Sequence, residues 1–249
     1  MSSEEPYEVI GIECRTPTIV ELWLRPLGSA LAFRPGEYVL LEDDDHKLPP
    51  RSYSLANPPR PDSVISLLVT RVPCGETSSW VHERLYAGET VRISGPYGTF
   101  VDDPTSTRPA LFLAAGSGLA PIRSLLEGAV SADARDSLTL IFSARAEEDV
   151  IDRARFEGWQ AQHARFRFIR TLTREAGTPP RGRIPGVLPL LHADLADHDV
   201  FIAGAPGFVV ACARAADALG AQRERVHTEV FFVEPQPWTA AVPAVKERR

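Results

Sequence analysis

The chain has 249 residues, of which 44% are hydrophobic and 24% are charged, so it can build a packed core and is not disordered as a whole. At roughly 100–200 residues per domain, this length suits one large domain or two small ones. Its 27 basic and 33 acidic side chains give a net charge of −6. This charge disfavours a nucleic-acid binder, because such proteins neutralise phosphates with clustered basic residues.

The cysteines, Cys14, Cys74 and Cys212, are too few and too scattered for a disulfide framework, a zinc cluster or a four-cysteine iron–sulfur cluster. This usage points to a reducing compartment. No apolar run approaches about 18 residues, and the acidic N-terminus does not resemble a signal peptide. We therefore expect a cytoplasmic protein. The acidic run at 42–46 is interpreted as a solvated loop, and no metal site is predicted.

The first hundred residues are predicted to form β-structure. Short alternating or apolar runs are separated by turn segments rich in Pro, Gly and Asp. The predicted strands are 7–14, 18–26, 37–42, 51–57, 64–72 and 90–96, and a helix is predicted at 76–85. Several short strands with one helix indicate a small closed barrel.

Residues 101–109, rich in Asp, Pro, Ser and Thr, are the predicted linker between two domains. After them, apolar runs alternate with helical runs, which is typical of a doubly wound α/β fold with a parallel sheet. The predicted strands are 109–116, 137–144, 165–173, 199–205 and 225–232, and the predicted helices are 119–130, 147–162, 186–193 and 207–220. We therefore divide the chain into a β-barrel domain (1–103), an α/β domain (104–235) and a Pro-rich tail (236–249).

One candidate site lies where an apolar strand runs into Gly116-Ser117-Gly118 and then a helix. A phosphate can approach the glycine backbone there, at the positive end of the helix dipole. Pro121 fits the first helical turn, where its missing N–H is not needed. The segment is neither a G-x-G-x-x-G fingerprint nor a G-x-S-x-G hydrolase elbow. A simple tight turn is the alternative interpretation.

A second candidate is the strand that begins with Arg51, Ser52, Tyr53 and Ser54. An arginine can bind a phosphate through two hydrogen bonds, and a tyrosine ring can stack on a flat heterocycle. An amphipathic edge strand is the alternative interpretation of the same residues.

A third candidate lies at the start of the helix in the first half, where Gly75, Thr77 and Ser78 occur together. The free N–H groups of a helix start can bind a second anion. The alternative is a helix that is simply capped by its own hydroxyl groups.

These motifs occur in an order that resembles the ferredoxin–NADP reductase superfamily. The segments are FRPGEYVLL at 33–41, RSYS at 51–54, G-x-x-S at 75–78, GPYGTF at 95–100, GSGLAP at 116–121, AGAPG at 203–207 and TEVFF at 228–232. The resemblance covers about residues 5–233. It implies a six-stranded antiparallel Greek-key flavin-binding β-barrel followed by a doubly wound α/β NAD(P)-binding domain, which agrees with the fold predicted above. It also implies an NAD(P)H-dependent flavoprotein reductase active in electron transport.

The resemblance implies that Arg51 binds a flavin phosphate, that Tyr53 packs on the isoalloxazine ring and that Ser54 lies near flavin N5. It places Glu229 close to Ser54, and Phe231 on the flavin face that nicotinamide must use. Ser54 and Glu229 are therefore the predicted catalytic residues. FAD is expected rather than FMN, because two anion sites suit a pyrophosphate. The other predicted flavin-binding residues are Ser52, Val69, Arg71, Gly75, Thr77 and Ser78.

The resemblance also assigns residues to the pyridine dinucleotide. They are Gly116, Ser117, Gly118, Pro121, Ser143, Arg145, Gly204 and Pro206. Thr173 and Arg174, with Arg183 soon after, resemble a site for the 2′-phosphate of NADPH, which needs cationic partners. NADPH is therefore expected rather than NADH. The alternative is that these arginines only solvate a loop.

Two departures from the family pattern affect the predicted function. Ala203 stands where the family usually has a cysteine beside the nicotinamide, and the chain lacks the cysteines of an iron–sulfur domain. We expect the electrons to pass to a separate ferredoxin or oxygenase component, or to free flavin, quinone or oxygen. The alternatives are a flavin-carrying electron-transfer subunit with little NAD(P)H oxidation of its own, an NAD(P)H:free-flavin reductase, and a regulatory protein with an empty barrel.

Overall fold

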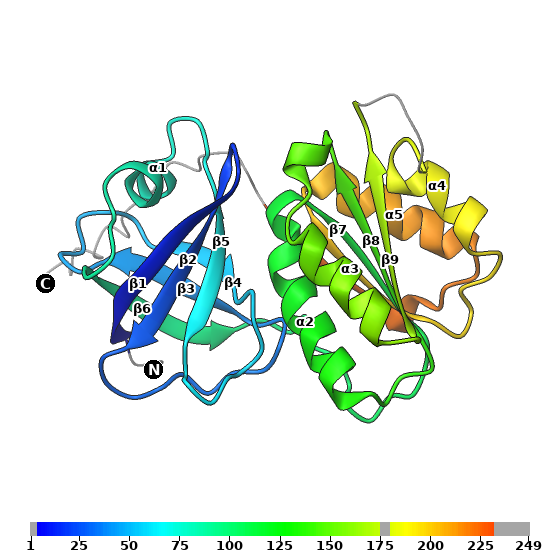
Figure 1. Cartoon of the computed structure of the whole chain (residues 1–249), viewed down its shortest axis with the longest axis horizontal. Coiled ribbons are helices and arrows are strands. Elements are labelled where there is room, and N and C mark those ends of the chain that lie inside the picture. The colour runs from blue at the N-terminus through cyan, green and yellow to red at the C-terminus, as the bar shows by residue number, and fades with distance from the viewer. Residues whose placement is uncertain (1–3, 175–179, 232–249) are drawn as a thin grey trace, which may run out of the picture.

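The computed structural model describes residues 4–174 and 180–231 and contains two sheets that lie side by side (Figure 1). One sheet has six antiparallel strands and the other has five parallel strands, so the predicted two-domain architecture is confirmed. The predicted tail at 236–249 lies outside the described residues. No helix within the described ranges has the length and apolar character needed to cross a membrane.

The first sheet wraps into a barrel around its own apolar core. Its strands are β1 (Glu4–Thr16), β2 (Ile19–Pro26), β3 (Tyr38–Asp43), β4 (Arg51–Ser54), β5 (Ile65–Thr70) and β6 (Thr90–Tyr97), with helix α1 (Glu76–Glu83) after β5. Their order across the sheet is β4-β3-β6-β1-β2-β5. A bridge between Leu55 and Leu67 joins the two outer strands and closes the barrel. Alternate side chains such as Val39 and Leu41 of β3 point into this core.

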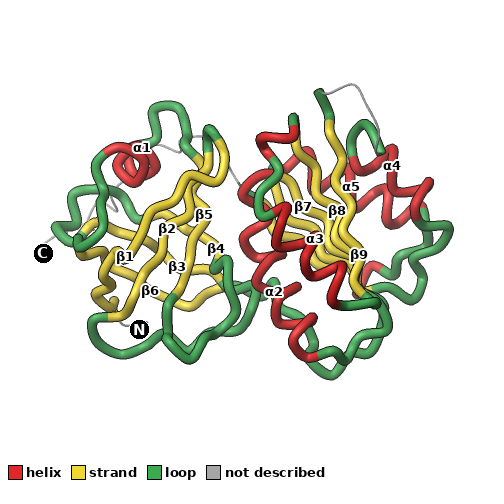
Figure 2. The backbone as a smooth tube through the Cα atoms, in the orientation of Figure 1, coloured by secondary structure: helices red, strands yellow, loops and turns green. Residues whose placement is uncertain are grey.

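The second sheet is covered by helices on both faces (Figure 2). Its strands are β7 (Ala110–Ala115), β8 (Leu138–Ala144), β9 (Phe166–Leu172), β10 (Asp199–Gly204) and β11 (Val226–Val230), in the order β11-β10-β7-β8-β9. The helices are α2 (Leu119–Ala132), α3 (Arg153–Gln162), α4 (Ile184–Leu191) and α5 (Pro206–Ala218). Phe112 and Ala114 pack with α2 and α3, whereas Leu111 and Leu113 pack with α4 and α5. Burial on both faces explains the continuous apolar run of β7.

Several predicted elements are shorter in the structure, and two of these changes bear on the interface between the domains. The helix predicted at 147–162 is interrupted: a 3₁₀ turn covers Glu147–Asp149, and α3 begins only after Asp152, whose backbone is left-handed (φ 55°, ψ 27°). The strand predicted at 51–57 ends at Ser54: the Leu55 N–H still bonds to Glu37, next to β3, but the Ala56 N–H bonds to Ser66 of β5. Both changes arise from contacts between segments far apart in the chain, which local sequence patterns do not encode.

The two sheets share a packed interface along α2. Ile19, Ala56, Leu68 and Phe100 of the first half belong to the same apolar cluster as the α2 side chains. Gly36 lies where the loop before β3 crosses this interface: its φ is +93°, and a Cβ atom there would lie 1.9 Å from the Phe100 carbonyl oxygen. A residue without a side chain is therefore required for the loop to pack against Phe100, and an added Cβ atom would also lie 3.2 Å from Leu125 Cδ2 of α2.

We expect Gly36→Ala to lower the free energy of unfolding by about 2–5 kcal/mol, combining left-handed backbone strain with overpacking. Gly88→Ala is the control, because Gly88 has a similar φ of +96° and a Cβ atom added there would meet nothing within 4 Å. The control should lose only about 1–2 kcal/mol of strain. Urea unfolding of both variants measures the difference, and equal losses would show that the contact with Phe100 does not matter.

Candidate active site

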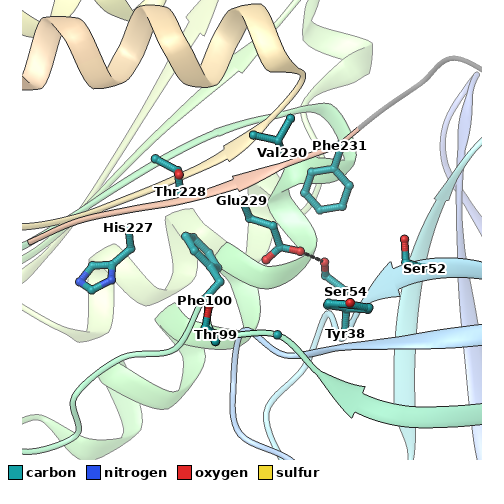
Figure 3. Close-up of a pocket in the computed structure, with 11 residues that line it drawn as sticks. Tyr38, Ser52, Ser54, Thr99, Phe100, His227, Thr228, Glu229, Val230 and Phe231 are labelled. Carbon is teal, nitrogen blue, oxygen red and sulfur yellow. Dashed lines mark hydrogen bonds between the residues drawn. The ribbon is translucent and has the colours of Figure 1, made fainter. Parts of the chain in front are cut away.

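A pocket of about 580 Å³ opens where the last strand of the second sheet faces strand β4 of the first (Figure 3). Such a volume is in the range of small-molecule and cofactor sites. The lining residues come from segments that are distant in sequence. They are Tyr38, Ser52, Ser54, Gly98, Thr99, Phe100, His227, Thr228, Glu229, Val230 and Phe231.

Ser54 and Glu229 join the two domains across this pocket. The Ser54 Oγ hydroxyl donates a hydrogen bond of 2.6 Å to Glu229 Oε1, although the residues are 175 positions apart. The proximity expected from the family resemblance is therefore present. Phe231 follows on the same strand end, where its N–H donates to the Gly204 carbonyl oxygen, and its ring faces the pocket (Figure 3).

The Glu229 carboxyl group is poorly solvated. Its Oε2 atom is buried and has no hydrogen-bond partner among the described residues. Burial raises the pKa of Glu229 to about 7, and the hydrogen bond from Ser54 opposes that rise. A carboxyl group with a pKa near neutrality can take up or release a proton under ordinary conditions.

The RSYS strand presents its side chains to two sides, as the alternation predicts. Ser52 and Ser54 line the pocket, while Tyr53 packs against the barrel core. Burial raises the pKa of Tyr53 to about 12, and the nearby charge of Arg51 opposes this, so the phenol stays neutral. Arg51 donates 3.1 Å from Nη1 to the Pro50 carbonyl oxygen and forms no ion pair with a described carboxylate. Its guanidinium group is thus available to an anion.

The start of α1 has hydroxyl groups that are already engaged. Thr77 Oγ1 donates 2.8 Å to the Pro49 carbonyl oxygen, and Ser78 Oγ accepts from the Val72 N–H. A Cβ on Gly75 would lie 2.6 Å from Ser78 Oγ and 3.0 Å from Val72 Cβ, so any larger residue would displace the Ser78 hydroxyl group. Gly75, the N-cap residue, makes no side-chain capping bond. The backbone N–H groups, rather than the hydroxyls, are what this turn can offer to a phosphate.

The predicted coenzyme turn lies at the switch point of the parallel sheet. The chain runs from β7 outward to β9 and then crosses back to β10 on the other side of β7, so the crevice between the carboxyl ends of β7 and β10 is the expected ligand site. Gly118 contacts β10 so closely that a Cβ would lie 2.3 Å from the Ala203 carbonyl oxygen. Gly204, with φ +155°, and Pro206, at the start of α5, continue the same edge.

Ser117, in the same turn, connects this edge to the first domain. Thr70 Oγ1, at the end of β5, donates a hydrogen bond of 2.7 Å to Ser117 Oγ. Gly116 has a φ of +56°, and Pro121 lies in the first turn of α2, as expected. The predicted coenzyme residue Ser117 therefore contacts the strand end that lies between the predicted flavin residues Val69 and Arg71.

Several predicted residues lie outside the pocket lining. Val69 is fully buried in the barrel core, and Arg71 forms an exposed ion pair with Glu83. Arg145 is held by Asp149 at 2.9 Å. Other predicted residues lie at the carboxyl ends of β8 and β9 or before α4: Ser143, Thr173, Arg174 and Arg183. Arg174 and Arg183 are exposed, on opposite sides of the segment 175–179 that the structure does not describe.

Some pocket residues were not assigned a role from the sequence. Tyr38 lies in the FRPGEYVLL segment, and Gly98, Thr99 and Phe100 lie in GPYGTF, both of which contribute to the resemblance. Gly98 has a φ of +104° and lies against the Tyr38 ring. The two glycines that flank the tyrosine of GPYGTF were the sequence signal that could have identified this segment as part of the site. His227 carried no such signal, since its role in the lining depends on the position of β11.

Comparisons with known proteins agree with this geometry. Residues 14–101 match the oxidoreductase FAD-binding domain family, and residues 112–214 match the oxidoreductase NAD-binding domain family. Ferredoxin–NADP reductase B of Sorangium cellulosum is 36% identical over 249 residues, which cover 93% of this chain and 100% of that protein. Reductase component 1 of terephthalate 1,2-dioxygenase from Comamonas is 33% identical over 223 residues.

That alignment covers 88% of this chain and 66% of the Comamonas protein, so the chain spans about two thirds of that relative's length. Among solved structures, a cytochrome P450 reductase of Amycolatopsis superimposes with a TM-score of 0.85 at 27% identity, covering 92% of this chain and 70% of that one. The ferredoxin reductase in carbazole 1,9a-dioxygenase gives a TM-score of 0.82 at 25% identity, with the same coverage of both chains.

We expect Glu229→Gln to remove a pH-dependent loss of stability. The pKa of Glu229 is raised to about 7 from an ordinary 4.5, so the folded protein holds a proton that the unfolded chain releases between these values. Stability present below pH 4.5 is therefore lost as pH rises through 7. The difference in the free energy of unfolding between Glu229→Gln and the parent should be roughly 2 kcal/mol more favourable to the variant at pH 8 than at pH 4. This figure allows for the partial exposure of Glu229 to solvent.

Urea unfolding of flavin-free protein at several pH values measures this gain. The exposed Glu224→Gln serves as a control and should follow the parent at every pH. Ser54→Ala should raise the Glu229 pKa further, because the hydrogen bond that it removes favours the ionised form. Parallel curves for Glu229→Gln and the parent would mean that the Glu229 carboxyl group titrates in the folded protein as it does in the unfolded chain.

Proposed function

The chain belongs to the ferredoxin–NADP reductase superfamily of NAD(P)H-dependent flavoprotein oxidoreductases, and we propose that it carries hydride from NADPH to a noncovalently bound FAD. The electrons then pass to a separate ferredoxin or oxygenase component. The observation that supports this most directly is the pocket in which Ser54 of the barrel meets Glu229 of the α/β domain. Cys14, Cys74 and Cys212 are free thiols, which favours a reducing compartment such as the cytoplasm.

The residues of the first domain fit FAD. Arg51 offers a guanidinium group without an ion-pair partner in the described chain, and the start of α1 offers N–H groups without a side-chain cap. Two such anion sites suit a pyrophosphate-containing flavin better than FMN. Tyr53 supplies a ring that stays neutral, next to the pocket-lining Ser52 and Ser54. When bound, the flavin would accept hydride from nicotinamide and release electrons one or two at a time.

In this proposal, Ser54 and Glu229 hold and transfer a proton. Ser54 Oγ orients the carboxyl group through its bond to Oε1, so that the unpartnered Oε2 is left to hold or give a proton. Phe231, which lines the pocket, would cover a bound flavin and exclude water from the face that nicotinamide must use. Gly118 lies close against Ala203, which supports the proposal that the coenzyme pyrophosphate would bind at the start of α2.

Ala203 favours a second candidate function, that of a flavin-carrying electron-transfer subunit with little NAD(P)H oxidation of its own. This residue is fully buried at the carboxyl end of β10, and a methyl group stands there in place of the family's thiol. A reductase lacking the thiol contact would hold nicotinamide less firmly against the flavin.

One experiment separates the two candidates. The absorbance spectrum of the purified protein is recorded without oxygen, before and after addition of NADPH or NADH, and the cofactor is then released by acid and identified by chromatography. Bleaching of an FAD spectrum by NADPH supports the reductase. An FAD spectrum that neither coenzyme bleaches supports the subunit, and FMN or no flavin contradicts the cofactor proposal.

We expect Arg51→Ala to weaken flavin retention, because a charge-assisted hydrogen bond to phosphate is lost. The loss should be roughly 1.5–3 kcal/mol, or about 10–150-fold in FAD affinity. Fluorescence titration of the flavin-free protein with FAD gives the constants. Arg25→Ala is the matched control, since Arg25 lies in the same sheet and pairs with Glu8 at the surface. If Arg51→Ala binds FAD as tightly as this control, Arg51 is not the phosphate ligand.

We expect Arg174→Ala to raise the apparent KM for NADPH by about 10-fold or more and to leave that for NADH nearly unchanged, since only NADPH carries the 2′-phosphate. Steady-state reduction of an artificial acceptor measures both values. Arg153→Ala, which removes an exposed arginine paired with Glu157 in the same domain, should change neither. Equal effects of Arg174→Ala on both coenzymes would contradict the assignment and the preference for NADPH.

A further inference from the structure

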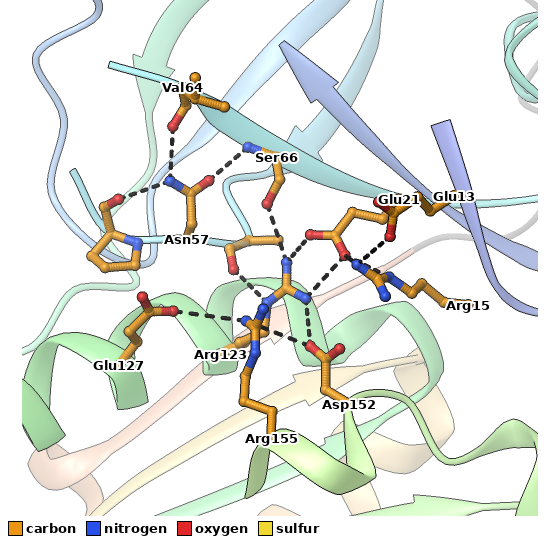
Figure 4. A network of polar contacts seen from close by, with 12 residues as sticks. Glu13, Arg15, Glu21, Asn57, Val64, Ser66, Arg123, Glu127, Asp152 and Arg155 are labelled. Atoms are coloured by element: carbon orange, nitrogen blue, oxygen red, sulfur yellow. Dashed lines mark hydrogen bonds and ion pairs between the residues drawn. The ribbon is translucent and has the colours of Figure 1, made fainter. Parts of the chain in front are cut away.

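A fully buried arginine lies between the two domains, and every one of its N–H groups is paired (Figure 4). Arg123 Nε donates 2.6 Å to the Ala56 carbonyl oxygen, and Nη1 donates to Glu21 Oε2 at 3.3 Å and Asp152 Oδ2 at 2.5 Å. Nη2 donates to Glu21 Oε1 and to Ser66 Oγ. These contacts match the five donors of a guanidinium group, so the orientation of Arg123 is fully specified.

The partners of Arg123 come from the elements that carry the two halves of the active site. Arg123 lies on α2, the helix that follows directly after the Gly116–Gly118 turn. Ala56 follows Ser54 by two residues, and Ser66 lies on β5, which ends at the Thr70–Ser117 bond. One rigid group therefore ties the coenzyme turn to the end of the RSYS strand.

Neighbouring residues hold these partners in place. Asn57 Oδ1 accepts from the Ser66 N–H at 2.6 Å, and Asn57 Nδ2 donates to the carbonyl oxygens of Pro58 and Val64. Arg15 Nε donates to Glu21 Oε2 at 2.7 Å. The fold therefore orders a second layer of polar contacts behind the first.

Asp152 meets Arg123 from a left-handed backbone. Its φ of +55° lies in a region that L-residues seldom adopt, although asparagine and aspartate do so more often than most. Burial opposes ionisation of Asp152, but the charges of Arg123 and Arg155 outweigh it and lower the pKa of the carboxyl group. Such a backbone persists where the surrounding structure imposes it, often at functional positions.

We propose that Arg123 is a positioning residue for hydride transfer, which fixes the orientation of the coenzyme turn relative to the flavin strand. This inference rests on the proposed function. Apolar contacts along α2 would hold the domains together but allow them to slide, whereas directional bonds to Glu21, Asp152 and Ala56 permit one arrangement. Displacement of reacting groups by about 1 Å can slow a reaction about 100-fold, so such control affects the rate directly.

The test separates orientation from stability. In the triple variant Arg123→Met, Glu21→Leu, Asp152→Asn, the buried charges are replaced together, a change that often leaves stability intact, and asparagine tolerates the left-handed backbone. We expect a melting temperature near that of the parent, at least a 10-fold slower flavin reduction in stopped flow, and affinity for ADP-ribose within about 2-fold of the parent. ADP-ribose lacks the nicotinamide ring, so its binding reports on the second domain alone.

A second variant, Arg123→Lys, keeps the charge but loses the fork of donors. It should slow flavin reduction at least 5-fold, and it should speed hydrogen exchange in α2 and β5 of the flavin-free protein. Arg155→Met is the matched control: Arg155 lies 3.7 Å from Asp152 and is partly exposed, and its loss leaves all five contacts of Arg123. The control should match the parent in both measurements.

Parental reduction rates and parental exchange in Arg123→Lys would overturn the proposal, as would a parental rate in a folded triple variant. If NADPH and NADH both fail to reduce the flavin of the parent protein, the proposed function fails. The exchange measurement then decides whether Arg123 fixes the domains.

Discussion

A guanidinium ion removed from water between two domains must find a partner for every donor, because an unpaired buried charge is strongly destabilising. Several features of the chain depend on this constraint. Glu21 interrupts the apolar side chains of β2, and Asp152 breaks a helical run so that its carboxylate reaches Arg123. Ala56 leaves the β4 ladder, and its carbonyl oxygen accepts from Arg123. The charged groups thus determine how the two domains are oriented, and apolar side chains fill the rest of the interface.

The pocket follows from this interface, since neither domain builds it alone. Ser54 ends the short strand β4, and Glu229 lies on the last described strand, β11. Their hydrogen bond forms only where the carboxyl edge of the parallel sheet faces the barrel. The same edge holds the switch point between β7 and β10, at which a dinucleotide is expected to bind. A flavin on one side and a nicotinamide on the other would therefore meet at the pocket that contains Glu229.

Much of the fold could be predicted from local pattern. Short alternating or apolar runs identified the strands of the first sheet, and apolar runs between helical segments identified those of the second; the Gly-Ser-Gly turn after β7 was apparent because strand, glycines and helix follow one another directly. The order of motifs, through the family resemblance, also predicted that Ser54 and Glu229 lie close together. The role of Arg123 was not apparent, because an arginine in an amphipathic helix usually faces water, and its partners are 67 and 102 residues away. The pairing of charged side chains from distant segments cannot be predicted from a local sequence pattern.

The alanine at position 203 bears on which of the two proposed functions the geometry favours. The close contact in the coenzyme turn is between Gly118 and the backbone carbonyl group of Ala203, not its side chain. Replacing a thiol by a methyl group therefore leaves the approach of the turn to β10 as it is, and the left-handed Gly204 and the helix start at Pro206 remain. In terms of the predicted coenzyme site, only one side-chain contact is missing. The other residues predicted to bind the coenzyme keep their arrangement, which favours a working reductase over a subunit that no longer uses NAD(P)H.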